Sequence, residues 1–359
     1  MISDRLERLR AILEEKKLDA LLVNKLVHLH YFSGFRGDDS VLVITRSRAL
    51  LVTDSRYVEQ AGQQAPLFEV VKQEEGLWNK AAECLKSLGC RNVGFEGDAL
   101  FYNDYARMAG LLEGIEFREA VDLNALRQVK EAQEISCIRR ACEIADRAFE
   151  DVLGFLRPGI SEIEVAAHLE NCMRQLGSEE PSFTTIVASG ERGSLPHGIA
   201  TEKLIVAGEF VTMDYGAVYQ GYHSDITRTV CMGTADDRQR EIYGKVLKAQ
   251  LAALEAIRAG VSGRAVDQVA RDSLERDGLG QYFGHGLGHS LGLEIHEEPR
   301  LSPRSKCEQL EPGMLVTDEP GVYIPGWGGL RIEDTVLVTG TGGDPLTRSS
   351  KQLMELKGQ

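Results

Sequence analysis

Residues 208–233 read GEFVTMDYGAVYQGYHSDITRTVCMG, two strand-like arms joined by a turn near Tyr219–Gly221. Two such arms on either side of a short glycine-containing turn are typical of a β-hairpin. If the turn is centred between Tyr219 and Gln220, Asp214 lies directly opposite Asp225. Two like charges directly across a ladder are destabilising, so this pairing needs a physical reason. The alternative is a slipped register in which both aspartates are solvated.

The same geometry appears in residues 314–338, MLVTDEPGVYIPGWGGLRIEDTVLV. Two strand-like arms flank a loop rich in glycine and proline, and a centre at Gly326 places Glu319 opposite Glu333. Because the flanking strands are apolar, we expect these acids not to be fully exposed. Two buried carboxylate pairs need either protons or cations. A pair of divalent ions would satisfy both hairpins at once.

Residues 284–299, GHGLGHSLGLEIHEEP, contain His285, His289 and His296 at a density that packing rarely requires. His289 can supply the nitrogen ligand that four carboxylates lack. A shell of one imidazole with Asp and Glu oxygens suits manganese, cobalt, zinc or ferrous iron better than a metal that prefers thiolates. Neighbouring glycines allow the backbone to come close to the ions. Alone, the spacing of His285 and His289 is a weak signal, since both could be ordinary polar residues of a turn.

A set of short motifs then follows in order along the second half of the chain: PHG (196–198), MDYG (213–216), SDITRT (224–229), GHGLGH (284–289), HEEPR (296–300), EPGVY (319–323) and RIED (331–334). This set resembles the metallopeptidases of the pita-bread fold, which include methionine aminopeptidase, aminopeptidase P and prolidase. The resemblance implies an α+β catalytic domain and hydrolysis of a peptide bond by a hydroxide that bridges two metal ions.

The resemblance also implies the metal ligands, residue by residue. Asp214, Asp225, His289, Glu319 and Glu333 would bind two divalent ions, with Asp225 and Glu333 bridging them. Manganese or cobalt is the expected metal, with zinc or iron as alternatives. The chain departs from many relatives in having an aspartate directly before Glu319. Strand alternation turns that aspartate, and the one after Glu333, away from the ions.

Other residues resemble the groups that surround the metals in this family. His197 and His296 would contact substrate and stabilise the tetrahedral intermediate, and His285 would line the site. Glu319 would also move the proton of the attacking water. The catalytic residues expected are therefore His197, His285, His296 and Glu319, and those expected near the substrate are Arg300, Tyr323 and Arg331.

The chain divides near residue 125 into a first part of α/β character and a second part that holds every suggestive polar residue. In residues 1–125, helical and strand patterns alternate, for example a leucine face in residues 6–13 and apolar strands at 41–45 and 49–53. This part resembles the creatinase-like N-terminal domain. Residues 126–359 begin with a long helix at 131–156, then a second helix capped by Ser161 and Glu164. After Pro181 we expect strands, with one helical interlude between about Asp237 and Asp277.

The N-terminal domain discriminates between the peptidases of this fold. Methionine aminopeptidases resemble the second part alone, whereas aminopeptidase P, prolidase and creatinase also have the first. Creatinase-type relatives lack the metal ligands, so cleavage of the Xaa-Pro bond at the amino end of short proline-containing peptides is implied. Arg300 resembles an arginine that binds the free carboxylate of a dipeptide, which favours an Xaa-Pro dipeptidase. Aminopeptidase P is the alternative, and a non-catalytic binding protein of the same fold is a remote one.

The bulk properties exclude several other classes. A net charge of −14 argues against a nucleic-acid partner, because the phosphate backbone would be repelled. No run of about 18 apolar residues is present, so we expect no membrane span. Seven scattered cysteines without a C-x-x-C pair suggest reduced thiols in the cytoplasm. Relatives commonly form homodimers in which the N-terminal domain reaches the neighbouring site, and residues 32–40 are a candidate for that loop.

Overall fold

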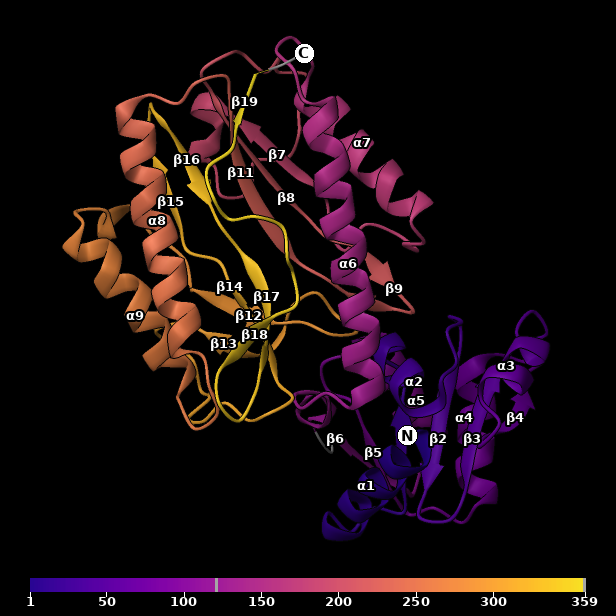
Figure 1. Cartoon of the computed structure of the whole chain (residues 1–359). Coiled ribbons are helices and arrows are strands. Elements are labelled where there is room, and N and C mark those ends of the chain that lie inside the picture. The colour runs from indigo at the N-terminus through magenta and orange to yellow at the C-terminus, as the bar shows by residue number, and fades with distance from the viewer. Residues whose placement is uncertain (120–121, 358–359) are drawn as a thin grey trace. The chain divides into compact units, whose positions relative to one another are not determined.

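The computed structural model describes residues 1–119 and 122–357 and divides into two compact units, Met1–Ala125 and Leu126–Gln359 (Figure 1). Each unit has its own hydrophobic core. No helix among the described residues is long and apolar enough to cross a membrane.

The first unit is built on one mixed six-stranded sheet with the strand order β4-β3-β2-β1-β5-β6. Its strands are β1 (Ala20–Val23), β2 (Val41–Thr45), β3 (Ala49–Thr53), β4 (Glu69–Lys72), β5 (Asn92–Phe95) and β6 (Glu116–Glu119). Its helices are α1 (Ile2–Glu15), α2 (Leu26–Ser33), α3 (Val58–Gln64), α4 (Leu77–Ser87) and α5 (Tyr102–Leu111). Both strands expected at 41–45 and 49–53 are present, and the expected leucine face of α1 is buried.

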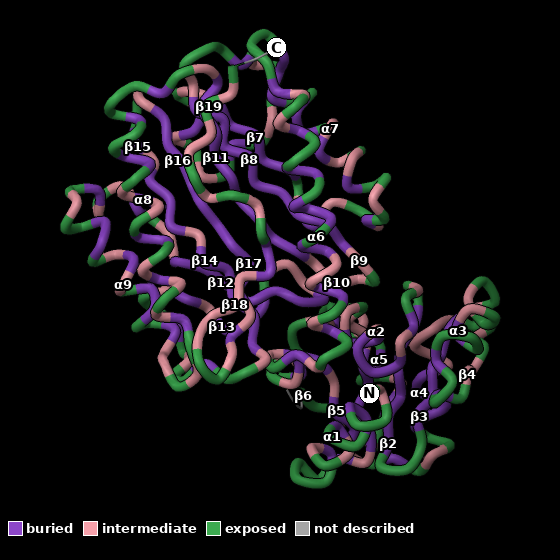
Figure 2. Tube along the Cα trace, in the orientation of Figure 1, coloured by how far each residue is buried: buried purple, intermediate pink, exposed green. Residues whose placement is uncertain are grey.

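The second unit begins with two helices that pack on a four-stranded sheet. The helices are α6 (Ala132–Phe155) and α7 (Glu162–Gln175), and α7 starts at the expected capping box of Ser161 and Glu164. Their buried faces share a core with β7 (Ile186–Ser189), β8 (Phe210–Tyr215) and β11 (Ile226–Met232), which lie in the sheet order β19-β11-β8-β7. Figure 2 shows β8 and β11 buried along their whole length, with β19 (Glu355–Leu356) at the edge. In this sheet β7, β8 and β11 are antiparallel, and β19 runs parallel to β11.

A second pair of helices packs against the remaining strands. The expected helical interlude is two helices, α8 (Asp237–Ala256) and α9 (Gly263–Arg276), so the prediction of one helical stretch was incomplete. Ser262 caps α9 by accepting a bond of 3.2 Å from the amide of Ala265. The strands are β12 (Gly288–Ser290), β13 (Glu297–Leu301), β14 (Leu315–Asp318), β15 (Gly321–Ile324), β16 (Gly328–Arg331), β17 (Asp334–Val338) and β18 (Gly343–Pro345).

The first acidic hairpin has a different register from the one predicted. Asp214 pairs with Thr227, and the two-residue turn is Gln220–Gly221 between β9 (Val218–Tyr219) and β10 (Tyr222–His223). Both turn residues have positive φ, 51° and 78°, as a tight hairpin turn requires. Asp225 is therefore displaced by two residues from the position opposite Asp214. A shift of two keeps both aspartates on the same face of the sheet.

The second hairpin has the predicted register. Asp318 pairs with Asp334 in β14 and β17, and Gly321 pairs with Arg331 in β15 and β16. This register places Glu319 opposite Glu333, between the two paired segments, so the prediction is confirmed. The neighbouring aspartates point the other way, where Gln250 donates a bond of 3.0 Å to Asp318.

Candidate active site

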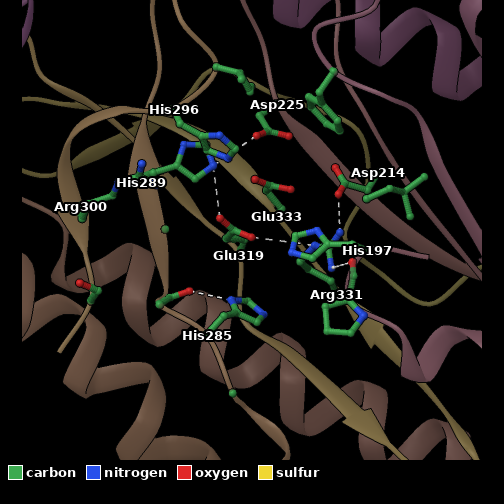
Figure 3. Close-up of a pocket in the computed structure, with 18 of the residues that line it drawn as sticks. His197, Asp214, Asp225, His285, His289, His296, Arg300, Glu319, Arg331 and Glu333 are labelled. Atoms are coloured by element: carbon green, nitrogen blue, oxygen red, sulfur yellow. Dashed lines mark hydrogen bonds and ion pairs between the residues drawn. The ribbon is translucent and has the colours of Figure 1, made fainter. Parts of the chain in front are cut away.

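All eleven residues singled out in the sequence line a single cavity of about 700 Å³ within the second unit (Figure 3). They are His197, Asp214, Asp225, His285, His289, His296, Arg300, Glu319, Tyr323, Arg331 and Glu333. They come from several elements that are far apart in the sequence. The fold therefore concentrates four carboxylates, four imidazoles and two arginines in one small space.

Three carboxylates meet at the floor of this cavity. Asp214 lies at the end of β8, Asp225 directly before β11, and Glu333 between β16 and β17. One oxygen of each lies within 4.8 Å of the others, and all three residues are buried. The Asp214 Oδ1, Asp225 Oδ1 and Glu333 Oε1 atoms have no hydrogen-bond partner among the described residues. Buried carboxylate oxygens without donors need protons or cations, so this cluster fits a binding site for divalent metal ions.

His289 and Glu319 extend the cluster. The His289 Nε2 atom lies 3.5 Å from Asp225 Oδ2 and 3.5 Å from Glu319 Oε1. Its Nδ1 atom lies 3.0 Å from the Ser290 carbonyl, which can only accept, so Nδ1 carries the proton. Burial lowers the pKa of His289 to about 3. A neutral imidazole therefore presents an unprotonated Nε2 to the carboxylates, as a metal ligand does.

The electrostatics of the carboxylates agree with this arrangement. Burial, with the nearby Glu333 and Asp214, raises the pKa of Asp225 well above its ordinary value. Burial, with Glu319 and Asp214, does the same for the pKa of Glu333. The pKa of Glu319 rises to about 7, mainly through burial, although Arg331 opposes the shift. Without cations the carboxyl groups of the cluster retain protons, because several buried negative charges repel one another. Bound cations would offset that repulsion and allow the carboxylates to ionise.

Arg331 connects this cluster to Tyr323 and His285, which also line the cavity. Its guanidinium forms an ion pair with Asp214 and donates a bond of 2.7 Å to the Tyr323 hydroxyl. The Tyr323 hydroxyl lies 2.9 Å from His285 Nε2, while His285 Nδ1 lies 2.7 Å from the Gly286 carbonyl. Since that carbonyl fixes the proton on Nδ1, the Tyr323 hydroxyl donates to Nε2. Arg331 and Tyr323 thus form a chain of contacts that runs from Asp214 to His285.

His197, His296 and Arg300 form the more open side of the cavity. The His296 ring lies 4.4 Å from that of His289, and burial lowers the pKa of His296. His197 is exposed. The Arg300 side chain is 41% exposed, and its Nε atom lies 4.0 Å from Glu298. This contact is too long for a hydrogen bond, so the guanidinium retains donors for a ligand.

The hydroxyl that links Glu333 and Arg331 was not identified from the sequence. Thr227 is fully buried, and its hydroxyl donates a bond of 2.6 Å to Glu333 Oε2. The same hydroxyl accepts a bond of 3.0 Å from Arg331 Nε. A signal was present in SDITRT, since Thr227 lies two residues after Asp225 and therefore on the same face of the strand.

Comparison with known proteins gives an independent line of evidence. The model for "Metallopeptidase family M24" matches residues 136–340, and the model for "Creatinase/Prolidase N-terminal domain" matches residues 5–129. The chain is 40% identical to a Xaa-Pro dipeptidase of Pyrococcus furiosus, over 98% of this chain and 100% of that protein.

Solved structures with the same fold agree. A Xaa-Pro dipeptidase from Bacillus anthracis matches with a TM-score of 0.95 and 45% identity, covering 99% of each chain. An X-Pro aminopeptidase from Thermotoga maritima matches with a TM-score of 0.91 and 36% identity, covering 98% of this chain and 99% of that one. The predicted fold class, an N-terminal α/β domain followed by an α+β catalytic domain, is confirmed.

Proposed function

This chain belongs to metallopeptidase family M24, and we propose on that basis that it hydrolyses the Xaa-Pro bond of dipeptides. The observation that carries the proposal is the buried cluster of Asp214, Asp225 and Glu333, which lines the cavity and has oxygens without hydrogen-bond partners among the described residues. The similarity to Xaa-Pro dipeptidases over nearly the whole chain supports the substrate class. We further propose that residues 1–125 and 126–359 are the two domains, with catalysis in the second.

Five residues would hold the metal ions: Asp214, Asp225, His289, Glu319 and Glu333. Two divalent ions bound there supply a Lewis acid for the scissile carbonyl and lower the pKa of the attacking water. We propose manganese or cobalt, because one imidazole with four carboxylates is a set of hard and borderline donors. The proposed working form is a homodimer, as the family resemblance implies, and the scattered cysteines without a C-x-x-C pair favour the cytoplasm.

The proton is moved by Glu319. As a carboxylate beside the proposed metal ions, Glu319 can accept a proton and release it again. We propose that Glu319 takes the proton of the attacking water and delivers it to the leaving nitrogen. Its Oε1 atom also accepts a bond of 3.1 Å from the Thr317 hydroxyl, which orients the carboxylate.

Charge that develops on the substrate oxygen is stabilised by histidines. The pKa of His296 is lowered by burial, so the imidazole is neutral near pH 7 and still has one N–H to donate. We propose that His296 donates this bond to the tetrahedral intermediate and that His197 binds the substrate beside it. His285 is held by the Tyr323 hydroxyl and lines the same cavity.

Arg300 would select dipeptides over longer peptides. A dipeptide ends in a free carboxylate close to the scissile bond, and a guanidinium recognises it by charge-assisted hydrogen bonds. The alternative is an X-Pro aminopeptidase that accepts longer peptides, which is supported by the similarity to the Thermotoga maritima structure.

The discriminating experiment is hydrolysis of Ala-Pro against Ala-Pro-Ala by the metal-reconstituted chain, with proline and alanine release followed by chromatography. We expect faster cleavage of the dipeptide. Preference for the tripeptide would support the aminopeptidase alternative. Cleavage of neither would favour a non-catalytic binding protein.

A further inference from the structure

The segment that carries His296 has little regular structure of its own. Residues 291–296 connect β12 to β13, and the pairing of these strands shifts between His289 and Ser290. A strand ladder therefore does not fix the position of His296 relative to His289. Some other interaction must hold the segment if both imidazoles are to keep their places.

Glu297 lies beneath this segment and supplies that interaction. Its side chain is 4% exposed, and its Oε1 atom accepts a bond of 3.1 Å from the backbone amide of Glu294. Its Oε2 atom accepts a bond of 3.1 Å from Lys130 Nζ. The chain passes so close to the carboxylate that a Cβ added at Gly292 would lie 2.9 Å from Glu297 Oε1.

Two buried cations balance the carboxylates of the segment. Lys130, with a side chain that is 1% exposed, also donates a bond of 3.0 Å to Ser290 Oγ, so its ammonium contacts both ends of the segment. The Arg127 guanidinium forms an ion pair with Glu294 and lies 3.3 Å from Glu297 Oε1. Burial alone would raise the pKa of Glu297, but Lys130 and Arg127 hold it below its ordinary value.

We propose that the buried Lys130–Glu297 ion pair is a positioning device for His296. Neither residue is among those that line the cavity, so the pair acts through the segment above it. The pair anchors both ends of residues 291–296, at Ser290 and at Glu297 itself. This inference rests on the proposed peptidase function, because it assigns a task to His296.

The test uses the variants Lys130→Met and Glu297→Gln in the full, metal-loaded chain. We expect kcat for an Xaa-Pro dipeptide to fall about 10- to 100-fold, as for other groups that orient active-site residues, while KM and metal content change little. In the His296→Ala background the same substitutions should lower kcat almost no further, because the ion pair is proposed to act on catalysis through His296, which is already removed. Glu297→Gln keeps the shape of the side chain, so it serves if Lys130→Met does not fold.

A second readout does not depend on activity. Amide hydrogen exchange in the metal-free chain should be faster at residues 291–296 in both variants and unchanged in α7. Lys203→Met is the control, because it removes a different lysine, which is partly buried and pairs with Glu209 at 2.7 Å. The inference is overturned if exchange at residues 291–296 is unchanged in the variants, or if their losses in kcat add fully to that of His296→Ala.

The proposed function fails separately if the wild-type chain does not cleave the dipeptide although the substitutions still speed exchange at residues 291–296.

Discussion

Thr227 donates a hydrogen bond of 2.6 Å to Glu333 and accepts one of 3.0 Å from Arg331. One hydroxyl thus joins the two acidic hairpins, since Thr227 belongs to the first and both partners to the second. The contact orients one of the proposed metal ligands and, through Arg331, its neighbour Asp214. Hydrogen bonds that orient metal ligands in this way contribute strongly to the affinity of a site for its metal.

Replacing Thr227 by valine should therefore weaken metal binding. We expect a loss of about 10- to 100-fold in affinity for manganese, because Glu333 loses a donor and Arg331 Nε loses an acceptor in a buried place. Isothermal titration of the metal-free chain measures the affinity directly. Thr227→Ser retains the hydroxyl and should bind nearly as well as wild type. Affinity that is lost in Thr227→Ser but kept in Thr227→Val would point to the methyl group instead.

His296→Ala should separate catalysis from metal binding. We expect kcat to fall by about 100-fold or more, because a hydrogen bond to the developing oxyanion is lost. Metal content should stay near that of wild type, since His296 contacts the ring of His289 and is not placed in the ligand set. Elemental analysis beside steady-state kinetics gives both quantities. A variant that loses its metals would show that His296 is itself a ligand.

Arg300→Ala tests how the enzyme recognises the end of its substrate. A charge-assisted bond to the dipeptide carboxylate is worth about 1.5–3 kcal/mol, or roughly 10- to 150-fold in kcat/KM. We expect a loss in that range for Xaa-Pro and a much smaller one for Xaa-Pro-Yaa. Similar losses on both substrates would mean that Arg300 does not bind the carboxylate and would favour the aminopeptidase alternative.

Stability should depend on pH and metal together. His285 and His289, with pKa values lowered to about 4 and about 3, stabilise the fold as pH rises, and that gain is complete by about pH 7. Glu319, with a pKa raised to about 7, and Asp225 and Glu333, with pKa values raised well above the ordinary range, act in the opposite direction. They stabilise the fold while protonated, and this stabilisation of the metal-free chain is lost as the pH rises through each raised pKa, which for Glu319 is about 7.

Denaturant unfolding at about pH 7 and about pH 8.5, with chelator and with manganese, measures this effect. The stabilisation by manganese should be larger at the higher pH, because cations replace protons that the carboxylates would otherwise retain. A double variant, Asp225→Asn with Glu333→Gln, should abolish most of the difference. A metal-free wild-type chain that is more stable at the higher pH would contradict the prediction.

Much of this fold could be predicted from local patterns, with errors where a turn or a break decided the outcome. Apolar alternation indicated both hairpins, and the register of the second was correct. The register of the first was wrong by two residues, because Gln220 and Gly221 form the turn with positive φ. The shift of two left the acids on one face, so the inferred cluster survived the error. The break between α8 and α9 was missed although Ser262 is a typical N-cap.

The contacts around the site were beyond the reach of sequence patterns. Thr227 and Glu333 are 106 residues apart, and Lys130 and Glu297 are 167 residues apart. Periodicity assigns a residue to a face of a strand or helix, but it does not identify the distant segment that packs there. The metal ligands could be assigned because a family resemblance joined separate motifs. A buried lysine in a short connecting segment belongs to no such motif.

The most direct test is proline release from an Xaa-Pro dipeptide as manganese is titrated into the chelated chain, with bound metal measured at each step. We predict that release is negligible without metal, rises with added manganese and is complete near two ions per chain. Asp225→Asn should bind less metal and release little proline at any concentration. A chelated chain that contains no metal and still cleaves the dipeptide at the full rate would contradict the proposed mechanism.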